Sequence, residues 1–202
     1  PVPRIRSYTV NRLNRALSIA LLAISAALGP AIAAADNPQI EVTTNLGTFT
    51  IELWPAEAPQ TVANFLRYVE RDFYDGIIFH RVISDFMIQA GGYNAEMDYL
   101  EPAGRVMNES VGGPRNLRGT IAMARQRNPD SADAQWFVNV KDNRHLDADG
   151  QRPGYTVFGT VTTGMDIVDR ISMVRTTVRA GMRDVPMDPV VIERVTHLDA
   201  EG

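Results

Sequence analysis

Residues 79–92, FHRVISDFMIQAGG, are the most informative stretch of this sequence. Alternation along FHRVIS predicts a strand with Phe79 and Arg81 on one face and His80 on the other. The FMIQ stretch that follows adds an aromatic ring, a thioether and the amide of Gln89. Arginine is a permanently charged donor and glutamine is a neutral donor and acceptor, and neither these nor the apolar pair is a nucleophile. The stretch therefore favours a reaction that needs no nucleophilic attack.

Further motifs follow in the chain: GTIAMAR at 119–125, AQWFVNV at 134–140, HLD at 145–147 and YTVFGTV at 155–161. Together with residues 79–92 they resemble, in order and spacing, the signature of the cyclophilins, the peptidyl-prolyl cis/trans isomerases. The similarity is greatest to the periplasmic bacterial cyclophilins. Five motifs in register are far more specific than any one of them alone.

The resemblance implies a mainly β fold, a closed eight-stranded antiparallel β-barrel capped by two α-helices, with the active groove on its outer wall. The residues themselves are compatible with this fold. Alternating apolar residues predict a β-hairpin at 40–54 and a last strand at 190–198. Helical spacing predicts helices over 59–73, with Pro59 in the first turn, and over 165–173. Residues 91–116 are expected to be a long irregular segment.

The resemblance also assigns roles to individual residues. Rotation about an X-Pro bond faces a barrier of ~20 kcal/mol, so a catalyst has only to favour the twisted amide. Arg81 matches the catalytic arginine, which acts near the prolyl nitrogen as its lone pair localises. Gln89 matches the residue that holds this arginine and bonds the substrate backbone. The other positions matching the substrate groove are Phe86, Met87, Ala124, Arg125, Gln135, Phe137, His145, Leu146 and Tyr155.

These side chains also have purely structural interpretations when the motif is ignored. Arg81 would then be a solvated residue or half of an ion pair that closes the barrel. Gln89 would be a surface amide or a satisfied core amide. The apolar residues Phe86, Met87, Phe137 and Leu146 would simply belong to the core.

Several residues depart from the usual family pattern. Ser84 replaces a proline, and Ala90 adds a methyl group where glycine is usual, which would be strained at positive φ. His145 stands where many eukaryotic cyclophilins carry a tryptophan that binds cyclosporin, so we expect weak cyclosporin binding. Tyr155 replaces a histidine, and Arg125 replaces an asparagine where substrate contact is largely through the backbone. Ser84, Ala90 and His145 support an alternative, a cyclophilin-like proline-peptide binding module or chaperone with little turnover.

Composition narrows the range of cofactors and partners. The chain has no cysteine, which excludes disulfides, thiolate metal sites and a catalytic thiol. His80, His145 and His197 lack the spacing of metal ligands, so we expect neither a metal nor another cofactor. All 24 acidic residues lie beyond residue 35, and four of the 20 basic ones lie before it, which leaves a formal charge of about −8 on the remainder. We therefore expect no binding to nucleic acid.

Residues 1–35 combine four arginines and no acidic residue with the apolar run ALSIALLAISAALGPAIAAA. This pattern is typical of a signal peptide cleaved before Asp36, with residues 36–202 as a single isomerase domain. An uncleaved membrane anchor is the alternative, although Gly29 and Pro30 interrupt the run and a spanning helix needs ~20 apolar residues. We therefore expect a periplasmic monomer without stable membrane association, acting on proline-containing exported polypeptides as they fold.

Overall fold

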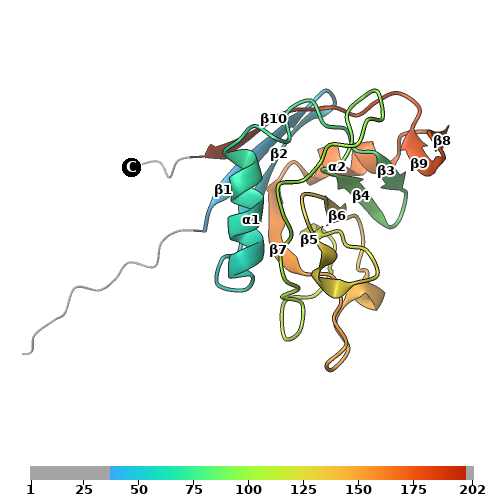
Figure 1. Cartoon of the computed structure of the whole chain (residues 1–202). Coiled ribbons are helices and arrows are strands. Elements are labelled where there is room, and N and C mark those ends of the chain that lie inside the picture. Colours follow the sequence, from blue (N-terminus) through green and yellow to red (C-terminus); the bar gives the residue numbers. More distant parts are fainter. Residues whose placement is uncertain (1–36, 199–202) are drawn as a thin grey trace, which may run out of the picture. The chain divides into compact units, whose positions relative to one another are not determined.

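The computed structural model describes residues 37–198, and all structural statements below concern that range. The strands are β1 (Gln39–Thr44), β2 (Gly47–Leu53), β3 (Arg81–Ile83), β4 (Met87–Ala90), β5 (Thr120–Met123), β6 (Trp136–Asn139), β7 (Val157–Thr163), β8 (Thr176–Arg179), β9 (Met182–Pro186) and β10 (Ile192–Leu198). The helices are α1 (Pro59–Val69) and α2 (Met165–Ser172), with short 3-10 turns at Pro129–Ser131 and Arg144–Leu146. An eight-stranded antiparallel sheet has the order β10-β1-β2-β7-β5-β6-β4-β3, and β8 and β9 form a separate hairpin (Figure 1).

The eight-stranded sheet curls, but its hydrogen-bonded ladder does not close between the edge strands β10 and β3. The segment that precedes β3 instead meets the start of β10 and the residue before it through isolated contacts. Ile78 forms a bridge with Val191, and the Ile192 N–H donates to the Ile77 carbonyl at 2.7 Å. The expectation of a fully closed barrel was therefore an overstatement, because residues 77–80 do not continue the regular pairing of β3.

The predicted hairpin and both predicted helices are confirmed. In β2, Phe49, Ile51 and Leu53 alternate into the core and are at most 1% exposed. Helix α1 ends at Val69, four residues before the predicted end, although Phe73 still packs against the core. No helix among residues 37–198 is both long enough and apolar enough to cross a membrane.

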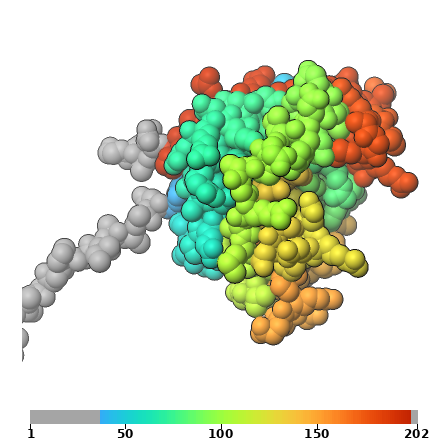
Figure 2. All heavy atoms as spheres, viewed as in Figure 1, coloured from blue at the N-terminus to red at the C-terminus, as the bar shows by residue number. Residues whose placement is uncertain are grey.

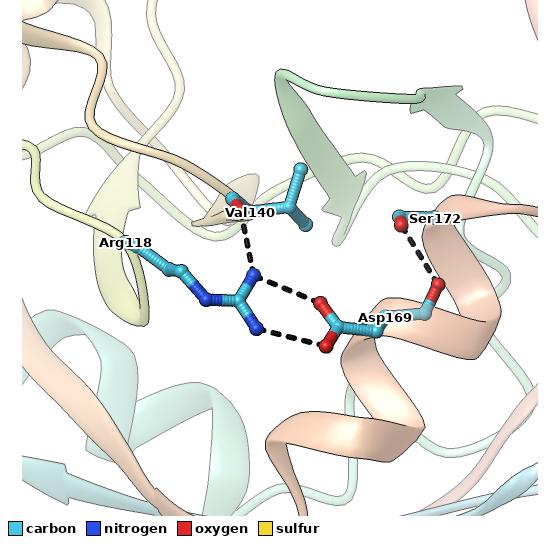
Figure 3. Close-up of polar contacts among 4 residues, drawn as sticks. All are labelled: Arg118, Val140, Asp169 and Ser172. Carbon is cyan, nitrogen blue, oxygen red and sulfur yellow. Dashed lines mark hydrogen bonds and ion pairs between the residues drawn. The ribbon is translucent and has the colours of Figure 1, made fainter.

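An ion pair fastens α2 to the strand region beside it. Arg118, just before β5, donates from Nη1 and Nη2 to the two carboxylate oxygens of Asp169 at 2.9 and 2.8 Å (Figure 3). Nη1 also donates to the Val140 carbonyl at 2.7 Å. The hydrogen bonds from Arg118 lower the pKa of Asp169 below its ordinary value. This bidentate arrangement orients α2 more strictly than a single contact would.

The N-terminus of α1 is capped from a distant part of the chain. Ala58 supplies no side-chain cap, and the carboxylate of Glu109 accepts from the backbone N–H of Gln60 at 3.1 Å and of Thr61 at 2.9 Å. The Thr61 hydroxyl donates to the same carboxylate at 2.7 Å. Figure 2 shows the segment that contains Glu109, in light green, covering the face beside α1. The long irregular segment is thus tied to the helix.

Glu109→Ala should lower the free energy of unfolding by ~1–2 kcal/mol, because it leaves the first helical N–H groups without an acceptor and removes a negative charge from the positive end of α1. Urea denaturation measures the change. Glu101→Ala is the matched control, since Glu101 lies exposed on the same irregular segment and should change stability by less than ~0.5 kcal/mol. Equal effects of the two substitutions would contradict the capping role.

Candidate active site

A second apolar cluster lies on the outer face of the sheet. Along β4 and β6, Ile88 and Val138 point into the main core, and their neighbours point outward. This alternation follows from the period of two in a strand. The outer cluster consists of Met87, Ala122, Phe137 and Val157, with Trp54, Ile83, Phe86, Ala124, Leu146 and Tyr155 packed against it.

A cavity of about 280 Å³ lies over the outer cluster. Larger hollows of about 470 and 560 Å³ lie beside Trp54 and Arg144, but neither includes Arg81. Of the residues assigned to the site from the sequence, all but His145 line the smaller cavity. They are Arg81, Phe86, Met87, Gln89, Ala124, Arg125, Gln135, Phe137, Leu146 and Tyr155.

Arg81 and Gln89 lie directly opposite each other in the β3–β4 ladder. Arg81 Nη1 donates to Gln89 Oε1 at 3.4 Å, and Gln89 Nε2 donates to Gln135 Oε1 at 3.0 Å. Arg81 forms no ion pair with any of residues 37–198, so the alternative of a barrel-closing ion pair finds no partner there. Its guanidinium thus keeps its charge and further N–H donors for the cavity.

The Arg125 side chain fixes the loop at Pro153 and Gly154, which lies at the rim of the cavity. Its Nε donates to the Gly154 carbonyl at 3.0 Å, and its Nη2 donates to the Pro153 carbonyl at 3.1 Å. The guanidinium carbon lies 4.6 Å from the centroid of the Tyr155 ring, a cation–π distance. The exchange of asparagine for arginine therefore adds a clamp between β5 and the loop before β7.

Buried amides hold the apolar wall in place. Asn143 Nδ2 donates to the Phe86 carbonyl and to Asn139 Oδ1, both at 2.8 Å. Asn139 Nδ2 in turn donates to Asn116 Oδ1 at 3.2 Å, and the Asn116 N–H donates to Asp147 Oδ1 at 2.7 Å. These bonds join Phe86 to the 3-10 turn that carries Leu146. None of these asparagines is assigned a role by the sequence motifs.

His145 lies outside the cavity. Its ring stacks on that of Phe86, with centroids 5.6 Å apart and planes at 26°. It lines the adjacent polar hollow together with Arg144. In this arrangement His145 supports Phe86 from behind, and its assignment to substrate binding stays a prediction.

The predicted alternation is wrong at Phe79 and His80. Phe79 packs in the main core with Val82, whereas His80 lines the cavity beside Arg81. The reason is that β3 begins only at Arg81, so regular alternation does not extend back to residue 79. His80 Nδ1 has no hydrogen-bond partner among the described residues. Burial, and next the charge of Arg81, lower the pKa of His80 to about 4.

The two departures inside the motif do not disturb the site. Ala90 lies in β4 opposite Trp136, and its φ is not positive. Its methyl group therefore does not cause the backbone strain that a positive φ would bring. Ser84 is exposed in the turn between β3 and β4 and does not line the cavity. The glycine requirement falls one residue later, at Gly91, where φ is 98°.

Two further lining residues, Tyr93 and Met182, were missed by the sequence analysis. Tyr93 lies in the segment expected to be irregular, where no periodicity indicates which side chains face the site. Met182 begins β9, which no motif covers, and only Gly181 beside it signals a turn. Among residues 37–198, no group of three or more histidine, cysteine or acidic side chains is arranged to hold a metal ion.

Comparison with known proteins shows the family to which the chain belongs. Residues 39–197 match the family model described as cyclophilin type peptidyl-prolyl cis-trans isomerase/CLD. Peptidyl-prolyl cis-trans isomerase cyp18 of Streptomyces antibioticus is 51% identical over 76% of this chain and 95% of that relative. Peptidyl-prolyl cis-trans isomerase B of Escherichia coli is 48% identical over the same shares of the two chains. The chain therefore belongs to the cyclophilin family.

Solved structures support the fold. A Cryptosporidium parvum cyclophilin type peptidyl-prolyl cis-trans isomerase superimposes with a TM-score of 0.67 at 20% identity, covering 81% of this chain and 99% of that one. The same protein in the presence of the dipeptide Ala-Pro gives a TM-score of 0.66 at 20% identity, covering 80% and 99% of the two chains. The curled sheet and its helices are thus the cyclophilin architecture.

The buried, neutral His80 should make stability depend on pH. Its folded pKa of about 4 lies below the ordinary 6.5, so the unfolded chain binds a proton that the folded chain does not. As pH falls from 6.5 towards 4, this difference should lower the free energy of unfolding by up to about 3 kcal/mol.

Chemical denaturation of wild type and His80→Phe over this pH range measures that loss. The variant should lose less stability than wild type as pH falls, because it lacks the titrating ring. The control, His197→Gln at an exposed position of β10, should follow the wild type. Parallel curves for wild type and His80→Phe would contradict the assignment.

Proposed function

We propose that this protein accelerates cis/trans isomerisation of X-Pro peptide bonds, as its family membership implies. The observation that carries the proposal is Arg81, which has no carboxylate partner among residues 37–198 and is held by Gln89 at the edge of an apolar pocket on the outside of the sheet. That arrangement suits a reaction in which no covalent bond is made or broken.

The apolar pocket binds the proline ring and removes water from the bond that rotates. Met87 and Phe137 form its floor, and both are nearly fully buried in the free protein, at 2% and 4% exposed. Phe137 meets Tyr155 edge to face at 5.7 Å, which gives the pocket a rigid aromatic wall. A preformed pocket costs little ordering on binding.

Arg81 stabilises the twisted amide. In the planar amide the nitrogen lone pair is delocalised, which contributes to the barrier of ~20 kcal/mol. When the bond twists, the lone pair localises on the prolyl nitrogen and can accept from a guanidinium N–H. This interaction is stronger in the transition state than in the ground state, which is the condition for acceleration.

Proline-containing polypeptides are the proposed substrates, and the protein acts on them as a monomer. Weak binding of cyclosporin is part of the proposal, because His145 has no indole N–H and its ring is stacked on Phe86. No metal or other cofactor enters the mechanism.

Arg81→Ala should lower kcat/KM for a proline peptide by a factor of ~10²–10³, because it removes the donor to the transition state. A protease-coupled isomerisation assay measures the rate. Arg105→Ala is the matched control, since Arg105 is exposed and lies outside the cavity. Thermal unfolding should show that both variants remain folded.

The same assay separates catalysis from binding alone. If wild type binds proline peptides yet turns them over no faster than the uncatalysed reaction, the protein is a binding module or chaperone. The ordinary backbone at Ala90 and the exposed position of Ser84 favour catalysis instead.

We propose further that residues 1–35 direct export to the periplasm and are cleaved there. This segment lies outside the described residues, and the proposal rests on its basic start and apolar run. Mass spectrometry of the protein recovered from the periplasm should give a chain that begins near Asp36. A full-length chain in the membrane fraction would show an uncleaved anchor.

A further inference from the structure

A third apolar cluster borders the cavity and takes no part in the mechanism proposed above. It consists of Ile78, Met97 and Val185, with Tyr93, Ala95, Met182 and Val191 packed against it. Residues 78–83 connect this third cluster to the outer cluster. Ile78 belongs to the third cluster, and Ile83 packs against the outer cluster. Arg81 therefore lies between two apolar surfaces along this segment.

The β8–β9 hairpin brings Met182 to the cavity. Its two-residue turn has φ of 51° at Ala180 and 80° at Gly181, and Arg179 pairs with Met182 across it. Two successive positive φ values are typical of the turns that join tight hairpins, so Met182 is fixed immediately after the turn. Val185, with no exposed surface, anchors β9 in the third cluster. Figure 1 shows β9 beside β3, the strand that carries Arg81.

Met182 itself is half-buried and shares the lining of the cavity with His80, Arg81 and Tyr93. One side of its side chain rests on the third cluster, and the cavity leaves another side available to a ligand. A thioether is apolar, flexible and polarisable, and it adapts to side chains of different shape.

We infer that Met182 determines specificity by contacting an apolar side chain of the substrate next to, or two residues from, the proline. The inference rests on the proposed function, because it takes the proline to lie in the outer cluster with its amide at Arg81. Arg81 and Met182 line the same cavity, and consecutive Cα atoms of a substrate are about 3.8 Å apart, so a residue close to the proline comes within reach of Met182. The positive charge of Arg81 disfavours lysine or arginine at that position of the substrate.

Isomerisation of a set of proline peptides tests the inference. The peptides carry leucine or alanine at each of the two positions before and the two positions after the proline. Wild type should prefer leucine over alanine in kcat/KM by about fivefold at one of these positions, as expected from partial burial of one aliphatic side chain. In Met182→Ala this preference should fall to less than about twofold, since the apolar contact is lost.

Met187→Ala is the matched control, because Met187 directly follows the hairpin, is 50% exposed and does not line the cavity. It should keep the wild-type preference. Met182→Gln, which keeps the length of the side chain but makes it polar, should lose the preference and carries the test if the alanine variant does not fold. A preference for leucine that survives in a folded Met182 variant, or a wild type without any preference, would overturn the inference.

A different result would contradict the proposed function. In that case wild type would turn over none of the peptides, and their affinities, measured by titration calorimetry, would take the place of kcat/KM. Loss of the leucine preference in affinity on Met182→Gln would still support the contact. An unchanged preference would exclude it.

Discussion

Two antiparallel ladders, β3–β4 and β4–β6, determine which side chains meet in the groove. Arg81 lies opposite Gln89, and Gln89 lies opposite Phe137, so a cation, an amide and an aromatic ring form one row across three strands. A slip of β4 by one residue would turn Gln89 into the core and bring Ile88 to the groove. The burial of Ile88 and its neighbours therefore fixes the site as well as the core.

In this row, neutral amide side chains hold the charged guanidinium of Arg81 in place. Gln89, which is itself bonded to Gln135, tethers Arg81 without neutralising it, whereas Arg118, just before β5, pairs with the carboxylate of Asp169. A carboxylate beside Arg81 would hold the guanidinium and compete with the substrate for its donors. An amide tether orients the side chain and leaves most of its donors free.

The site residues in this row could be predicted from the sequence, but several residues and contacts around the row could not. The resemblance assigns Gln89 and Phe137 to the site, and the alternation of side chains along β4 and β6 then keeps both on the outer face. His80 was misplaced because irregular pairing precedes β3, and local sequence does not reveal where a strand begins. The contact between Glu109 and α1 could not be predicted, because it joins a helix to an aperiodic segment 48 residues away. Met182 lies on a hairpin whose burial follows no simple period.

The two thioethers of the cavity differ in their access to solvent, and this has a chemical consequence. Met87 is 2% exposed, whereas Met182 at the rim is half-buried. In a chain without cysteine, methionines are the sulfur groups available to an oxidant, and sulfoxide formation makes an apolar side chain polar. An oxidant reaches Met182 before Met87. Mild oxidative damage would therefore alter the rim of the groove first and spare the pocket in which the proline ring is bound.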